Sequence, residues 1–128
     1  MKNLNVIGKI SVAGCMLGLL GVAGIAAAGQ KVTQSVTAHS SYIFGNLADA
    51  RNSASAIEML EIRDYGTYMY ITGVMASGSM GGCTTSNATA MAQLRAAKSD
   101  AQVRANIASG TCTNVYVANS SWHAPKNP

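Results

Sequence analysis

The sequence predicts a mainly α protein: an N-terminal membrane helix that continues into a long helix, then a Gly-rich connector, a helical hairpin and a short extended tail. Three observations lead to this fold class. Residues 10–30 carry no charge, apolar residues then recur every seven positions, and residues 86–109 are rich in Ala. The predicted division of the chain is a basic cytoplasmic tail (1–9), a transmembrane helix or signal anchor (10–30), a small helical exported domain (31–118) and a flexible tail (119–128).

The apolar run lies between Lys9 and Lys31 and contains 21 residues. At ~1.5 Å per residue a helix of this length measures ~31 Å, which matches the hydrocarbon thickness of a bilayer. Lys2, Lys9 and the amino terminus outweigh Lys31, so the amino terminus is expected in the cytoplasm of a bacterial inner-membrane protein with an exported C-terminal domain. The alternative is a signal peptide cleaved after Ala26–Ala28, which gives a secreted protein or an extracellular filament.

One face of the predicted membrane helix consists of glycines at spacings of four, three and three residues. Small residues at such spacings let a second helix backbone approach closely. The pattern therefore predicts self-association of the chain within a lipid bilayer, so a second copy and the bilayer are the expected partners. The predicted packing residues are Gly14, Gly18, Gly21 and Gly24.

The formal net charge of +4 belongs mostly to the residues that flank the apolar run. Without Lys2, Lys9 and Lys31, six basic residues remain against five acidic ones. This balance and the absence of a basic patch argue against nucleic acid as a partner.

From Val36 onward an apolar residue falls at every seventh position. This spacing predicts a helix packed in a bundle or a coiled coil. The seam consists of Val36, Ile43, Ala50 and Ile57, with Leu47 and Ala54 placed four residues after two of them.

Cys83 and Cys112 are expected to form one disulfide, because pairing is the default in an oxidising compartment. A straight helix over 86–109 would hold them ~40 Å apart. Ser99 and Gln102 read as a capping box, so a second helix is predicted to begin there and to fold back as a hairpin. Otherwise the two cysteines pair between chains or stay free. Thr111–Ala118 is predicted to be one strand or an extended tail.

No residue pattern predicts catalysis, a cofactor or a metal site. A zinc site of Cys83, Cys112, His39 and His123 lacks the short ligand spacings that make such sites recognisable. The sequence contains neither a phosphate-binding glycine loop nor a nucleophile elbow. The prediction is therefore a protein that is not an enzyme.

The opening Met1–Lys9, which runs directly into the apolar helix, resembles the start of bacterial methyl-accepting chemotaxis receptors, and Leu47–Asp64 looks like the first helix of their periplasmic four-helix-bundle sensor. The resemblance implies a truncated sensor module, without a second span or a signalling coiled coil. The function predicted is thus a non-enzymatic, membrane-anchored helical protein that self-associates. Two alternatives stay open: a pilin-like filament subunit that packs through its apolar helix, and a small secreted disulfide-bonded protein.

Overall fold

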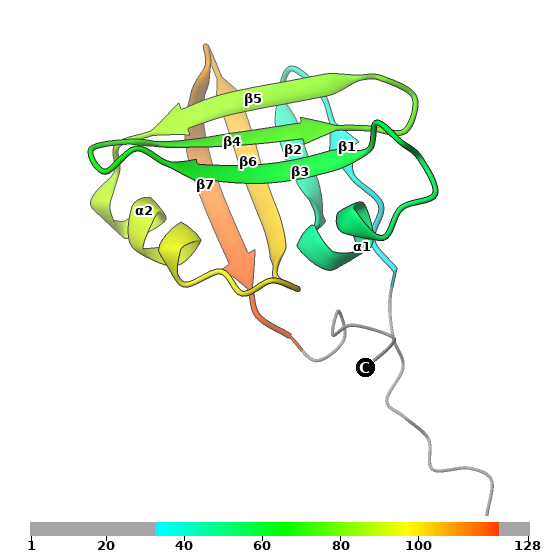
Figure 1. The fold of residues 1–128 in the computed structure, drawn as a ribbon. Coiled ribbons are helices and arrows are strands. Elements are labelled where there is room, and N and C mark those ends of the chain that lie inside the picture. The colour runs from blue at the N-terminus through cyan, green and yellow to red at the C-terminus, as the bar shows by residue number, and fades with distance from the viewer. Residues whose placement is uncertain (1–32, 121–128) are drawn as a thin grey trace, which may run out of the picture.

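The computed structural model describes residues 33–120, which form a mainly β domain with two short helices (Figure 1). The elements in chain order are β1 (Thr37–Ala38), β2 (Tyr42–Asn46), α1 (Leu47–Arg51), β3 (Met59–Asp64), β4 (Met69–Val74), β5 (Met80–Thr85), α2 (Ala88–Arg95), β6 (Gln102–Ala108) and β7 (Thr111–Ala118). The predicted mainly α fold is therefore wrong.

The seven strands form one sheet in the order β1-β2-β6-β7-β5-β4-β3. All neighbours are antiparallel except β5 and β7, which meet in parallel at a single residue pair, Thr84 and Thr111. This short junction divides the sheet into a meander of β3, β4 and β5 and a second half of β1, β2, β6 and β7. Figure 1 shows the meander lying across the second half, so that the two halves enclose the core.

The core lies where the two halves face one another. Ile43 of β2 and Ile71 of β4 are both fully buried, as is Val103 of β6. Gly73 of β4 makes the close approach possible, because a Cβ there would lie 2.8 Å from the Ile43 side chain. The remaining members of the core cluster are Val36, Ala38, Ala50, Leu60, Met69, Cys83, Met91, Leu94, Ala105 and Cys112.

The predicted long helix over the seven-residue seam is replaced by strands and loops. Ile43 lies in β2 and Ala50 in the five-residue helix α1, whereas Ile57 is exposed in the loop before β3. The residues at this seven-residue spacing therefore do not lie on one face of a helix. β-branched and aromatic residues cluster in Tyr42–Phe44 and again in Tyr70–Thr72, and such residues fit a pleated, half-buried surface better than a helix.

The predicted helical hairpin over 86–109 is also wrong. Only α2 is helical, and the segment from Gln102 forms β6. Val103 and Ala105 are fully buried while Arg104 between them is exposed, which is the two-residue period of a strand. In place of a helix cap at Ser99, the Ala101 N–H donates to the Lys98 carbonyl at 3.0 Å in a turn.

The mainly β fold overturns the resemblance to a chemoreceptor sensor, because that sensor is a bundle of four helices. It equally overturns the predicted function of a membrane-anchored helical protein. The alternative of a pilin-like subunit depends on packing through the apolar N-terminal helix, which lies outside the described residues. Within residues 33–120 no helix is both long and apolar enough to cross a bilayer, so the predicted inner-membrane location has no support there. The apolar run at 10–30, its glycine face and the tail at 1–9 lie outside the described residues.

Candidate functional site: an apolar groove beside an open strand edge

Cys83 and Cys112 form a disulfide, with their Cα atoms 5.1 Å apart. The bond joins β5 to β7 beside the Thr84–Thr111 pair, at the junction of the two half-sheets. The cysteines therefore meet because their strands are neighbours, and not at the open end of a helical hairpin as the sequence predicted. Because both sulfurs are used in this bond, the two cysteines are not thiolate ligands for zinc.

The strand β3 is the long open edge of the described sheet, since it ends the strand order and pairs only with β4. The Tyr65 N–H donates to the Tyr68 carbonyl at 3.0 Å just beyond this pair of strands. Antiparallel strands alternate between residues that bond to the neighbour and residues that do not. Glu61 and Arg63 therefore direct their backbone groups toward β4, and Leu60 and Ile62 direct theirs away from it.

The opposite edge of the sheet, β1, is only two residues long and is covered. The Ser79 hydroxyl, in the turn before β5, donates to the Ala38 carbonyl at 3.0 Å. Gly81 lies so close to the His39 backbone that a Cβ at this position would overlap the His39 carbonyl. The open edge of the described sheet is therefore at β3 and not at β1.

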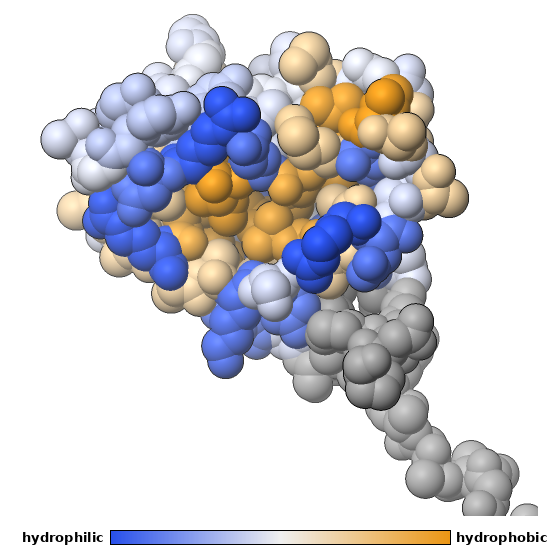
Figure 2. Space-filling view, in the orientation of Figure 1, coloured by the Kyte–Doolittle hydropathy of each residue, from blue (hydrophilic) through white to orange (hydrophobic). Residues whose placement is uncertain are grey.

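Two adjoining hollows follow the open side of β3 and together form what we name the β3 groove. Their volumes are about 330 and 420 Å³, and they share Leu47 and Ser99. Figure 2 shows this groove as a hollow of apolar residues between two hydrophilic flanks. Its lining extends from Leu47 of α1 to Leu94 of α2, and Figure 1 shows where these two helices lie. The apolar lining comes from Leu47, Ala50, Met59, Leu60, Ile62, Met69, Leu94 and Ala97.

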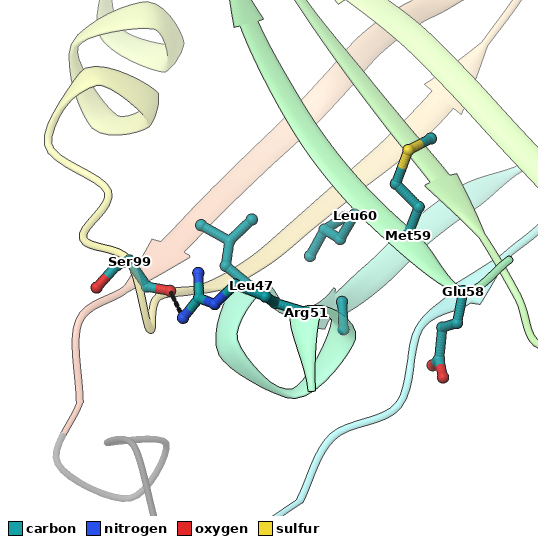
Figure 3. Close-up of a pocket in the computed structure, with 7 residues that line it drawn as sticks. Leu47, Arg51, Glu58, Met59, Leu60 and Ser99 are labelled. Carbon is teal, nitrogen blue, oxygen red and sulfur yellow. Dashed lines mark hydrogen bonds between the residues drawn. The ribbon is translucent and has the colours of Figure 1, made fainter. Parts of the chain in front are cut away.

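Side chains from two sides of the β3 groove converge on its first hollow. In Figure 3, Leu47 of α1 and Leu60 of β3 point toward one another, whereas Glu58 points away from the space between them. Leu60 is buried against α1, and Ile62 further along the strand packs partly buried against the core. The alternation of Leu60 and Ile62 with Glu61 and Arg63 thus turns the apolar side chains of β3 inward.

Asn46 holds the wall of the groove that faces β3. This residue is fully buried and caps α1, because its side-chain oxygen accepts the N–H groups of Ala48 and Asp49 at 2.9 and 3.0 Å. Its amide group also donates to the Asp100 carbonyl at 2.7 Å. One side chain therefore fixes both α1 and the loop before β6, which carries Lys98 and Ser99.

The two carboxylates that line the groove are already engaged. Glu58 accepts the Val36 N–H at 2.6 Å and the Ser53 hydroxyl. Asp64 forms an ion pair with Arg95 at 2.7 Å and accepts the Gly66 N–H at 2.8 Å. The hydrogen bond from Arg95, with help from Gly66, lowers the pKa of Asp64 to about 2. Arg95 thus neutralises the charge of Asp64, whereas Glu58 is held by two neutral donors and keeps its negative charge.

Two cations on the opposite wall have no acidic partner among residues 33–120. Arg51 donates only to the Ser99 carbonyl, at 3.4 Å, and is drawn against it in Figure 3. Lys98 is exposed, and no carboxylate of residues 33–120 lies within ion-pair distance of it. Both cations lie beside Ser99, where the two hollows of the groove meet.

The sequence analysis missed the β3 groove entirely. The signal was present in Leu60–Glu61–Ile62–Arg63, where apolar and charged residues alternate as they do in a half-buried strand. This run was interpreted as part of the sensor-like helix Leu47–Asp64. The predicted partners of the chain, a second copy and a lipid bilayer, remain predictions, because the glycines on which they rest lie outside the described residues.

Within residues 33–120 no group of three or more His, Cys, Asp or Glu side chains is placed to hold a metal ion. The chain matches no protein-family model, no curated protein and no solved structure.

Proposed function

We propose that this protein is a small, disulfide-bonded binding module without enzymatic activity, which takes up an extended segment of a partner polypeptide along β3. The observation that carries the proposal is the coincidence of two features. The unpaired backbone edge of β3 and the apolar groove occupy the same place, so one extended chain contacts both.

Strand addition supplies both affinity and selectivity in such a site. The backbone groups of Leu60 and Ile62 bond to the added chain, and alternate side chains of that chain enter the groove. Burying one Val or Leu side chain contributes ~1.5–3 kcal/mol, so two inward residues give a measurable affinity after the cost of ordering the peptide. The two hollows suit two inward side chains.

The disulfide supports a role in an oxidising compartment, where such bonds persist. It also rigidifies the meander that presents the open edge, because it ties β5 to β7 at their single pair of residues. The prediction that best agrees with this domain is the small secreted disulfide-bonded protein.

The test is an NMR titration of the oxidised full chain with the peptide acetyl-Ser-Thr-Val-Gln-Val-Thr-Ser-amide. The amide signals of Leu60 and Ile62 should shift on binding and become protected from hydrogen exchange. The amides of Glu61 and Arg63 are already protected by β4, so their exchange should change little. Shifts confined to the outer face of β4 and β5 would overturn the proposal.

Two variants at Ile62 separate backbone pairing from side-chain packing. Ile62→Ala and Ile62→Pro both remove the apolar side chain, but only Ile62→Pro removes the free N–H. Ile62→Pro should therefore bind the peptide several-fold more weakly than Ile62→Ala. Equal affinities would mean that β3 does not pair with the ligand.

A measurement on the unaltered chain guards against misfolding of the Ile62 variants. Two versions of the same peptide are compared. One is N-methylated at its odd-numbered residues and the other at its even-numbered residues. Only one of these two sets of backbone N–H groups faces β3. One of the two methylated peptides should therefore lose binding and the other should keep it. Equal binding by the two would contradict strand addition.

A further inference from the structure

The outer face of β3 carries two opposite charges that are two residues apart. Glu61 and Arg63 form an ion pair at 2.7 Å, and their side chains are 31 and 53% exposed. Both lie on the face away from the core, because the neighbouring Leu60 and Ile62 turn inward. A strand added to β3 therefore meets an acid and a base along its outer side.

The pairing geometry brings the outward residues of an added strand close to these two charges. The backbone groups of Glu61 and Arg63 already face β4, so an added antiparallel strand places its residues opposite them in non-hydrogen-bonded pairs. Side chains approach most closely in such pairs, with Cβ atoms about 4.5–5.5 Å apart. The residues opposite Leu60 and Ile62, in contrast, turn inward to the groove.

We infer that the segment bound along β3 carries a basic residue opposite Glu61 and an acidic residue opposite Arg63, and that this order of charges sets its direction. The inference rests on the function proposed above and names the ligand of that site. In an antiparallel strand the residue opposite Arg63 comes first, so the segment reads acidic, apolar, basic, apolar. Its two apolar residues enter the two hollows of the β3 groove.

An antiparallel direction continues the meander, in which β3, β4 and β5 alternate in direction. Parallel pairs are slightly less stable per residue. Opposite charges that face each other across two strands stabilise the pair, whereas like charges in the same positions destabilise it. A segment with the exchanged order of charges meets two like charges, unless it binds in the less stable parallel direction.

The ion pair within β3 leaves both side chains able to take a second partner. It joins the Nε of Arg63 to one carboxylate oxygen of Glu61, and Tyr65 is a further hydrogen-bond partner of Arg63. A guanidinium has five N–H donors and a carboxylate has two acceptor oxygens. The four charges of the complex then alternate in sign along each strand and across the pair.

A second copy of this chain presents the same order of charges in Glu61–Ile62–Arg63. Its inward side chains are not available to the groove, because Leu60 is buried and Ile62 packs against the core of their own domain. An extended segment of another protein brings inward residues that have no such contacts. The occupant assigned here is therefore a partner peptide.

Two peptides of identical composition test the order of charges on the oxidised full chain. They are acetyl-Ser-Glu-Val-Lys-Val-Thr-Ser-amide and its exchanged form, acetyl-Ser-Lys-Val-Glu-Val-Thr-Ser-amide. At low ionic strength the first should bind about three- to tenfold more tightly, because both of its outward charges meet opposite charges. Added salt should reduce the difference, since these charges are exposed. Equal affinities, or tighter binding of the exchanged form, would overturn the inference.

A nitroxide label at the N-terminus of the first peptide reports its direction on the unaltered chain. In the antiparallel complex this end lies beside Asp64. The label should therefore broaden the amide signals of Asp64 and Tyr65 more than those of Glu58 and Met59. The opposite pattern would mean parallel binding and would contradict the assigned order.

A double variant tests whether the charges of β3 are responsible. Glu61→Lys/Arg63→Glu keeps the net charge and an opposite pair on β3 but exchanges their order, so the exchanged peptide should now bind more tightly. The matched control is Lys98→Gln, which removes a charge from the groove wall and should leave the preference unchanged. If Lys98→Gln abolishes the preference, or if the double variant keeps the preference of the parent, the outer face of β3 does not select the ligand and the inference fails.

The outcomes distinguish the two proposals. If both peptides shift the amides of Leu60 and Ile62 with equal affinity, the order of charges is wrong and the strand-binding function stands. If neither peptide shifts these amides, the function itself is wrong. Sedimentation is measured in parallel, and a dimer that Ile62→Pro dissociates while Ile62→Ala does not would assign β3 to a second copy and overturn the assignment to a partner peptide.

Discussion

The two edges of this sheet end in opposite ways, although one disulfide-bonded domain contains both. At β1 the turn before β5 donates a hydrogen bond to Ala38, and Gly81 brings β5 against the His39 backbone. At β3 no further strand of the described chain pairs, and the backbone borders an apolar groove. The β1 edge is closed by Gly81 of β5 and by the Ser79 hydroxyl in the turn before β5, and not by its own side chains. Availability for binding is thus a property of the packing around an edge.

The charged residues of β3 illustrate the same point. Glu61 and Arg63 form an exposed ion pair on the outer face at 2.7 Å, where they leave the inner face and the backbone edge unobstructed. Charges that point inward from an edge strand are one of the devices that prevent pairing. Neither Leu60 nor Ile62 is such a charge, so β3 keeps an edge that can accept a strand.

The largest expected effect comes from opening the disulfide that joins β5 to β7 at the junction of the two half-sheets. The bond spans a sequence separation of 29 residues, and in the chain-entropy model a loop of that size contributes about 3.5 kcal/mol. The double variant Cys83→Ala/Cys112→Ala should therefore lower the free energy of unfolding by about this amount, measured by urea denaturation. A loss below about 1 kcal/mol would contradict the model.

Hydrogen exchange locates the effect of the same change. Because β5 carries Gly81, freeing β5 from β7 should raise exchange at His39, whose N–H bonds to the Tyr42 carbonyl. The amides of Leu60 and Ile62 already face away from β4, so their exchange should change little. Equal increases at both edges would show that the disulfide acts on the whole domain.

The next effect concerns Gly81, the residue that covers β1. In Gly81→Ala the new Cβ overlaps the His39 carbonyl, which is backbone and cannot rotate away. Overpacking of this kind costs about 1–3 kcal/mol, and β1 should detach from its cover. The measurement is the urea midpoint together with the exchange of the His39 amide.

Met80→Ala is the control for Gly81→Ala, because Met80 is 63% exposed on the same strand. It should leave the stability within about 0.5 kcal/mol of the parent. If Gly81→Ala is equally harmless, the closed edge does not depend on this glycine, and Gly81 does not explain why β1 is covered while β3 is open.

Part of this fold could be predicted from the sequence and part could not. The pairing of Cys83 with Cys112 follows from the oxidising compartment that the sequence predicts, and the helical content of Ala88–Arg95 follows from its Ala-rich composition. Thr111–Ala118, predicted as one strand or an extended tail, forms the strand β7. The other strands were missed because several are weakly marked: β5 reads Met-Gly-Gly-Cys-Thr-Thr, and only Gly permits its close contacts. No local pattern predicts that Gly81 faces His39, since the two residues meet only through the crossing of the half-sheets.

The site was missed for a related reason. Leu60 and Ile62 do carry the two-residue period of a strand, but an edge is defined by which strands are absent beside it. Arg51 and Lys98 lie far apart in the sequence, and only the wall held by Asn46 brings them together beside Ser99. Neither the groove nor its cations could therefore be predicted without the topology.

A smaller effect is expected at Asn46, which supports the wall opposite the open edge. Asn46→Ala removes the cap of α1 and the bond to Asp100, and it should cost about 2 kcal/mol. Peptide binding at β3 should weaken as well, while the exchange of the His39 amide stays unchanged. Thermal unfolding and the peptide titration described above measure these two consequences.

Two further substitutions make the Asn46 result specific. Asn46→Ser can keep an acceptor for the cap but is too short to hold Asp100, so its cost should fall between those of the parent and Asn46→Ala. Asn87→Ala removes the exposed cap of α2 and should cost about 0.5–1 kcal/mol without altering peptide binding. If Asn87→Ala weakens peptide binding as much as Asn46→Ala does, binding depends on the stability of the whole domain and not on the support that Asn46 gives to the groove.

The smallest expected effect is a pH dependence at the end of the open edge. The pKa of Asp64 is lowered from 3.8 to about 2, first by the hydrogen bond from Arg95 and then by the Gly66 N–H. A lowered pKa in the folded protein means that the stabilisation is fully present above about pH 4 and is lost as the pH falls toward 2. Because Asp64 and Arg95 are exposed, the change should be local: the Gly66 amide should exchange faster, with little change in global unfolding.

An NMR titration of the Asp64 carboxyl carbon measures this pKa directly. In Arg95→Gln it should rise from about 2 toward the ordinary value of 3.8, because the largest cause of the shift has been removed. Arg63→Gln removes an equal charge from β3, the strand that carries Asp64, but Arg63 pairs with Glu61, so the pKa of Asp64 should stay low. If the pKa of Asp64 remains near 2 in Arg95→Gln, the Gly66 N–H is its main cause, and the ion pair does not fasten α2 to the open strand.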